Sequence, residues 1–121
     1  MRAIHLVVPA LAVLAACATT PRQSCEATYR NQLATVRSEI RDTEQVLQRG
    51  FRLVPTLSTF GPHYCLSPGG HVRPCFGNEE GPMFDKRPIN RRAETAKLTA
   101  LRQEETRLTA GLAQCAVQYP E

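Results

Sequence analysis

Four of the five cysteines are placed symmetrically along this chain of 121 residues. The midpoint between Cys25 and Cys115 is Gly70, and the midpoint of the other pair, Cys65 and Cys75, is the same residue. Four cysteines in an exported chain are expected to form two disulfides, for which three pairings are possible. A chain that folds back on itself at its middle brings both nested pairs together. We therefore predict Cys25–Cys115 and Cys65–Cys75 disulfides.

The start of the chain has the pattern of an export signal. A short basic segment carrying Arg2 precedes the nearly continuous apolar run 6–14, which is typical of a signal peptide. A membrane-spanning helix needs about 20 apolar residues, and the polar residues from Thr19 onward interrupt the run too early. We expect residues 1–16 to be removed, which leaves one mature domain over 17–121.

The apolar run closes with Leu14-Ala15-Ala16-Cys17, which resembles the lipobox of bacterial lipoprotein precursors. The resemblance implies that Cys17 carries a covalent lipid and becomes the first mature residue, with the membrane as its partner. We expect no other cofactor. Ala18 is not the acidic retention signal that this family uses in the inner membrane. The resemblance therefore implies an outer-membrane protein that faces the periplasm, and it covers only the first 17 residues.

Two segments have apolar residues at alternating spacings of three and four, which is the pattern of an amphipathic helix. A capping box over Thr20–Gln23 starts the first segment, and Gly50 stops it. We predict helices over about 21–49 and 90–118. Their apolar stripes are Tyr29, Leu33, Val36, Ile40, Thr43 and Leu47 in the first, and Leu98, Leu101, Leu108, Leu112, Cys115 and Tyr119 in the second, where Glu105 interrupts the stripe.

The two predicted helices match in length, because Cys25 to Arg49 and Arg91 to Cys115 are 25 residues each. We expect a mainly α fold, an antiparallel two-helix hairpin resembling a coiled coil, with the outer disulfide closing its open end. The paired positions in this register are Tyr29 with Gly111, Leu33 with Leu108 and Ile40 with Leu101.

Proline and glycine are concentrated in the connection 50–88, with five of each between Phe51 and Arg87. This composition predicts a long loop with little regular structure. The turn sequence 67–70 predicts one exception, a small hairpin over Tyr64–Phe76 that the Cys65–Cys75 bridge staples.

The centre of the loop also permits a metal-site interpretation. Two thiols and two imidazoles satisfy the ligand requirements of zinc, but their spacing lacks the close pairs of a typical zinc site. A disulfide with two surface histidines is the simpler outcome in an oxidising compartment, so we expect no metal. The four residues concerned are His63, Cys65, His71 and Cys75.

We assign no catalytic residues. The adjacent carboxylates Glu79-Glu80 and Glu104-Glu105 do not converge on one substrate atom, because neighbouring side chains on a helix or strand point apart. A cysteine nucleophile would be lost to disulfide formation.

The mature chain is basic, with 14 basic and 11 acidic side chains and a formal charge of +3. Its basic residues gather where the predicted helices meet the loop, and Glu44, Asp85 and Glu94 partly neutralise them. Such a patch either attracts an anionic envelope component or an acidic protein, or is simply a soluble tip. Nucleic acid is not expected. The predicted patch consists of Arg49, Arg52, Lys86, Arg87, Arg91 and Arg92.

These patterns favour a lipid-anchored, non-enzymatic envelope protein that presents its loop to another envelope component. Two alternatives stay open. The helical stripes favour a homodimer in which two hairpins assemble into a structural helical bundle, and the cysteine and histidine set favours a small periplasmic metal-binding protein.

Overall fold

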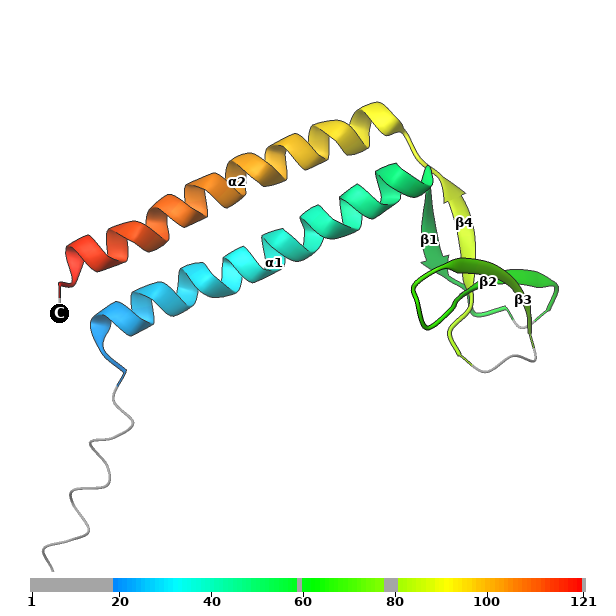
Figure 1. Ribbon diagram of the computed structural model, residues 1–121, viewed down its shortest axis with the longest axis horizontal. Coiled ribbons are helices and arrows are strands. Elements are labelled where there is room, and N and C mark those ends of the chain that lie inside the picture. The colour runs from blue at the N-terminus through cyan, green and yellow to red at the C-terminus, as the bar shows by residue number, and fades with distance from the viewer. Residues whose placement is uncertain (1–18, 59, 78–80, 121) are drawn as a thin grey trace, which may run out of the picture. The chain divides into compact units, whose positions relative to one another are not determined.

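The computed structural model describes residues 19–58, 60–77 and 81–120 (Figure 1). It contains two helices and four strands, and the chain divides into two compact units. One unit holds the described residues up to Thr35 together with those from Glu105, and the other runs from Val36 to Glu104. The elements in chain order are α1 (Pro21–Arg49), β1 (Phe51–Pro55), β2 (Pro62–Leu66), β3 (Val72–Phe76), β4 (Phe84–Pro88) and α2 (Arg91–Gln118).

The predicted fold class, a two-helix hairpin with an irregular loop, is wrong, because the connection forms a four-stranded antiparallel sheet and the fold is α+β. The prolines that predicted a loop lie where strands tolerate them. Pro55 ends β1, Pro62 begins β2 and Pro88 ends β4. Pro74 lies inside β3, which is an edge strand of the sheet order β1-β4-β2-β3.

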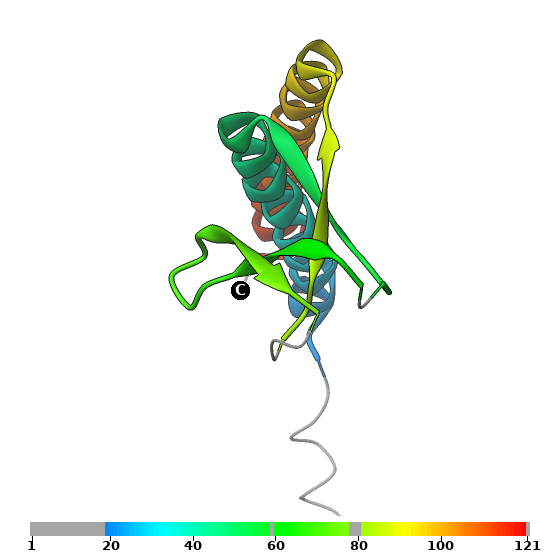
Figure 2. The ribbon, with the colours of Figure 1, turned by 90° about the vertical axis from the view of Figure 1, so that its right-hand side faces the viewer.

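The sheet consists of two antiparallel ribbons with a narrow junction (Figure 2). β1 and β4 pair over their full lengths, although a long stretch of sequence separates them. β2 and β3 also pair over their full lengths. The two ribbons join where Tyr64 of β2 pairs with Phe84 of β4. The four strands therefore form one sheet, but a single residue pair connects its two ribbons.

The β2–β3 ribbon confirms the small hairpin predicted around residues 67–70. Its turn is closed by backbone hydrogen bonds from the Ser67 amide to the His71 carbonyl (2.9 Å) and from the Gly70 amide to the Ser67 carbonyl (2.8 Å). Gly70 has a φ of 78°, a conformation that glycine adopts without steric cost.

The larger unit contains the ends of the helices that lead into and out of the sheet. α1 stops because Gly50, at a φ of 82°, donates its amide to the Val46 carbonyl at 2.9 Å. Asn90 caps α2 by accepting a hydrogen bond from the Ala93 amide at 3.2 Å. Ile40, Thr43 and Val46 of α1 are buried in this unit.

The smaller unit contains the first turns of α1 and the last turns of α2. The predicted capping box is present, since the Thr20 amide donates to Gln23 Oε1 (3.1 Å) and the Gln23 amide donates to Thr20 Oγ1 (3.2 Å). Leu33 and Leu108 are both buried here, in agreement with their predicted pairing.

Candidate functional site

One face of the sheet is almost entirely apolar. Residues that pair directly across antiparallel strands point to the same side, and alternate residues along a strand point to opposite sides. The strand register therefore assigns each residue to a face, and Lys86 is the one charged side chain among the twelve on this face. The apolar face consists of Phe51, Leu53, Pro55, Pro62, Tyr64, Leu66, Val72, Pro74, Phe76, Phe84, Lys86 and Pro88.

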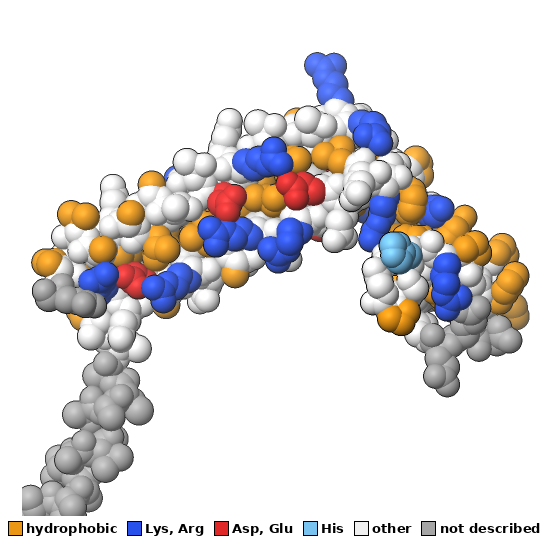
Figure 3. Space-filling model, in the orientation of Figure 1, with side chains coloured by type: hydrophobic (Ala, Val, Ile, Leu, Met, Phe, Trp, Pro, Cys, Tyr) orange, Lys and Arg blue, Asp and Glu red, His pale blue; other side chains and the backbone are white. Residues whose placement is uncertain are grey.

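None of these twelve side chains is buried. Phe76 is 63% exposed and Leu66 is 42% exposed, and Figure 3 shows hydrophobic side chains at the surface over the strands. The largest contiguous apolar patch on a protein surface is often a binding site. The apolar face is therefore the candidate interaction site.

The opposite face of the sheet carries the buried groups, although its residues are more polar. His63, Cys65 and Cys75 are buried there. This distribution is the reverse of an ordinary half-buried sheet, in which the apolar face is covered. The other residues of this face are Arg52, Val54, Arg73, Asp85 and Arg87.

His63 is a buried residue that links neighbouring segments, not the surface histidine that the sequence predicts. Its side chain is 8% exposed. Nδ1 lies 3.1 Å from Asp85 Oδ1, and Nε2 lies 2.9 Å from the Phe60 carbonyl oxygen. The ring thus connects β2 to β4 and to the segment before β2. His71, by contrast, is exposed in the hairpin turn.

The strand register separates those members of the predicted basic patch that lie in the sheet. Arg52 donates to Asp42 (3.2 Å) and to Glu94 (2.9 Å), and the hydrogen bond to Glu94 is the main cause that raises the pKa of Arg52. Arg52 and Arg87 pair across β1 and β4 on one face, whereas Lys86 lies on the other. Arg49 is half-buried at the end of α1, and Arg91 and Arg92 are exposed at the start of α2.

Lys86 is held by aromatic rings. Its Nζ lies 4.1 Å from the centroid of the Tyr64 ring and 4.4 Å from that of Phe51. Both distances are within the range of cation–π attraction. The single charge on the apolar face is therefore fixed at a defined position.

Both predicted disulfides are closed. Cys25 is bonded to Cys115, with Cα atoms 5.9 Å apart, and Cys65 is bonded to Cys75, with Cα atoms 5.8 Å apart. The inner bridge uses both sulfurs that the zinc interpretation requires. Among the described residues, no three metal-ligating side chains gather as a metal site requires.

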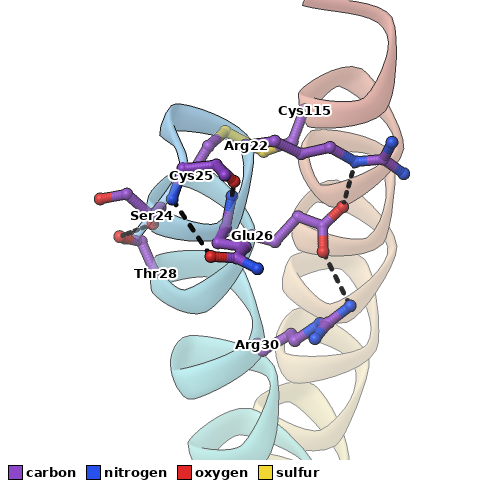
Figure 4. The surroundings of a disulfide bond; sticks show 9 residues. Arg22, Ser24, Cys25, Glu26, Thr28, Arg30 and Cys115 are labelled. Carbon is purple, nitrogen blue, oxygen red and sulfur yellow. Dashed lines mark hydrogen bonds and ion pairs between the residues drawn. A yellow bond between two sulfur atoms is a disulfide. The ribbon is translucent and has the colours of Figure 1, made fainter. Parts of the chain in front are cut away.

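Three charged side chains lie beside the outer disulfide (Figure 4). Glu26 accepts hydrogen bonds from Arg22 Nε at 2.9 Å and from Arg30 Nη2 at 2.8 Å. The hydrogen bond from Arg22 is the main cause that lowers the pKa of Glu26, and the positive charges of Arg30 and Arg22 add to it. These contacts stabilise α1 next to Cys25.

Cys17, the predicted lipidation site, lies outside the described residues. Within the part of the chain that is described, neither helix combines the length and the hydropathy required to cross a bilayer.

The apolar face was missed at the sequence level, although its signal is present. Residues 62–66 and 72–76 alternate between proline or large apolar residues and a second set of His, Cys and Arg, which is the period of a strand. Pro62 and Pro74 concealed part of that period, because proline is typical of loops rather than of strands. Comparison with known proteins finds no matching family model, no similar curated protein and no similar solved structure.

Proposed function

We propose that this chain is a lipid-anchored, non-enzymatic protein of the bacterial cell envelope that binds another envelope component through the apolar face of its sheet. The Leu14-Ala15-Ala16-Cys17 motif supports the anchor on Cys17. Ala18 supports a location in the outer membrane, facing the periplasm.

The observation that carries the binding role is the exposure of the apolar face. Seven of its twelve side chains are exposed and five are half-buried. Keeping such a face in water has no benefit for folding, because the hydrophobic effect favours covering it. A binding partner that covers the face supplies the missing burial.

Assembly through the helices receives less support. Leu33, Ile40 and Val46 of α1 are already buried. Among the described helical residues, the only exposed large hydrophobic side chain is Val117, at 82%. The apolar stripes that would pair two hairpins are thus largely used within the chain.

A photo-crosslinking amino acid placed at position 76 in cells tests the binding role. We expect a discrete adduct of fixed mass from Phe76, which lies on the apolar face. The same probe at Val117 is the matched control, because Val117 is exposed but lies on α2. Equal adducts from both positions, or none from position 76, would contradict a binding role for this face.

The anchor has its own test. Cys17→Ser should leave uncut precursor and abolish incorporation of labelled fatty acid, because the cysteine sulfur carries the lipid in lipoproteins of this kind. Normal processing of the variant would contradict the proposed anchor without affecting the crosslinking result.

A further inference from the structure

The size of the apolar face limits what can bind it. Four strands of five residues cover a footprint of about 300 Å², from a strand spacing of about 4.8 Å and a rise of about 3.3 Å per residue. A stable protein interface buries about 800 Å² on each partner. A projected footprint is smaller than the accessible area of the side chains that rise from it. This face alone is nevertheless small for a stable protein interface, which favours a bound surface that needs no matching shape.

Two large apolar side chains outside the strands extend into solvent. Leu57 is 101% exposed and Phe60 is 87% exposed. Both lie in the connection between β1 and β2, close in sequence to Pro55 and Pro62 of the apolar face. Protruding apolar side chains on a short connection are suited to insertion among lipid chains, which requires apolar area but no matching shape.

The apolar face offers little for a protein to hydrogen-bond. A protein interface forms about one hydrogen bond per 100–200 Å², whereas Lys86 is the one charged or amide-bearing side chain on this face. Its Nζ lies over the rings of Tyr64 and Phe51. A lysine whose carbon stem crosses apolar surface and whose ammonium stays accessible matches the boundary between acyl chains and phosphate groups.

Positive charge is concentrated in the unit that contains the sheet. Val36–Glu104 holds eleven basic and eight acidic side chains, a formal charge of +3, whereas the other unit holds four and three, of which Arg2 belongs to the predicted signal peptide. A net positive charge draws a protein toward anionic lipid. Apolar face, protruding side chains and charge are thus all properties of one unit.

We propose that the apolar face, together with Leu57 and Phe60, inserts into the surface of a bilayer that contains anionic phospholipid, with Lys86 at the level of the phosphate groups. This inference rests on the proposed binding role of the face and names the bilayer surface as the bound component. The chain then contacts lipid through its own side chains in addition to the acyl anchor.

A tryptophan reporter tests the insertion directly, because the chain contains no tryptophan. The protein is the mature chain 17–121 with Cys17→Ser, which removes the lipid as a cause of binding, and with both disulfides closed. Phe76→Trp places a single reporter on the apolar face, and Val117→Trp places one on α2 as the control. Vesicles of phosphatidylcholine with phosphatidylglycerol, with or without brominated acyl chains, are the probe.

We expect the emission of Trp at position 76 to shift to shorter wavelength and to be quenched by the brominated chains, while Trp at position 117 changes little. No quenching at position 76, or equal quenching at both positions, would overturn the proposal.

Matched variants separate the apolar and the electrostatic contributions. Leu57→Ser with Phe60→Ser should weaken vesicle partitioning at least tenfold, whereas Val117→Ser should leave it unchanged. Both sets remove exposed side chains, so folding is little affected.

Lys86→Gln should reduce the preference for phosphatidylglycerol over pure phosphatidylcholine, and Lys97→Gln should not. Partitioning that none of these changes alters would refute insertion through this face.

The crosslinking experiment in cells distinguishes this proposal from the broader one. A lipid adduct at position 76 supports both. A protein adduct, including a second copy of the chain, together with no vesicle binding, overturns the bilayer proposal and leaves the binding role intact. The absence of any adduct and of vesicle binding rejects both.

Discussion

Tyr29 of α1 packs directly against Gly111 of α2, at the position predicted from the cysteine register. A Cβ atom built on Gly111 would lie 2.6 Å from Tyr29 Cζ and 3.0 Å from Cδ1, and closer still to Cε1. Such separations are too short for real contacts, so the aromatic ring occupies the space that any side chain at position 111 would need.

Gly111→Ala should therefore destabilise the protein, although alanine normally favours a helix. Overpacking costs about 1–3 kcal/mol, which exceeds the gain of about 1 kcal/mol from helix propensity. Thermal denaturation of the oxidised protein measures the difference. In a Tyr29→Ala background the same change should become stabilising, because the ring is absent. A destabilising effect of equal size in both backgrounds would contradict this packing.

A substitution at Thr43, in contrast to Gly111→Ala, should stabilise the protein. It is 0% exposed, and its hydroxyl has no hydrogen-bond partner among the described residues. Thr43→Val keeps the shape and removes an unsatisfied polar atom, so it should raise the free energy of unfolding by about 1–3 kcal/mol. Thr43→Ser keeps the hydroxyl and deletes a methyl group, and it should lower the free energy of unfolding by about 1 kcal/mol. Urea denaturation of the two variants checks both signs, and a destabilising Thr43→Val would refute the assignment.

The pKa of Glu26 predicts how stability depends on pH. Its hydrogen bond from Arg22 lowers this pKa from the ordinary value of 4.5. A lowered pKa in the folded state means that the contribution of Glu26 is present above pH 4.5 and is lost as the pH falls through the folded value. The urea midpoint of Glu26→Gln should therefore fall less than that of the parent protein between pH 6 and pH 3. Glu39→Gln, an exposed carboxylate on the same helix, is the control and should follow the parent.

The two disulfides should differ in their effect on stability. The bridged residues are 90 positions apart in the outer bridge and 10 apart in the inner bridge. In the loop-entropy model these separations correspond to about 4–5 and about 2–3 kcal/mol. Cys25→Ser with Cys115→Ser should therefore lower the melting temperature more than Cys65→Ser with Cys75→Ser. Similar losses from both double variants would show that chain entropy does not dominate.

The helices and the disulfides could be predicted because their signals are local or numerical. Leu33 and Leu108 belong to stripes with helical spacing, and both are buried. The cysteine positions indicated a chain that doubles back, and both bridges agree with it. The capping box and Gly50 marked the bounds of α1 because capping depends on few neighbouring residues.

The sheet could not be predicted from the same signals. β1 and β4 pair although Phe51 and Pro88 are far apart in sequence, and no local pattern specifies such a partner. Pro74 lies within the small hairpin that the sequence predicts, and β3 accommodates it because an edge strand tolerates an unpaired backbone position. The binding face was missed for the same reason, since faces exist only once strands are recognised.

His63 shows a further limit of sequence interpretation. Its contacts are a carboxylate in β4 and a carbonyl oxygen in the segment before β2. A histidine two residues before a cysteine suggested a metal site or a solvated side chain. Only the contacts between the strands showed that His63 links β2 to β4.

The outer bridge makes most of the polypeptide a covalent ring, since Cys25 and Cys115 enclose nearly every described residue. An envelope protease that cuts anywhere between these two cysteines cannot release a fragment by a single cleavage. A nicked molecule would keep its mass, apart from one added water, until a reductant opened the ring. Proteolytic damage to this protein is therefore invisible on a non-reducing gel and becomes visible only after reduction.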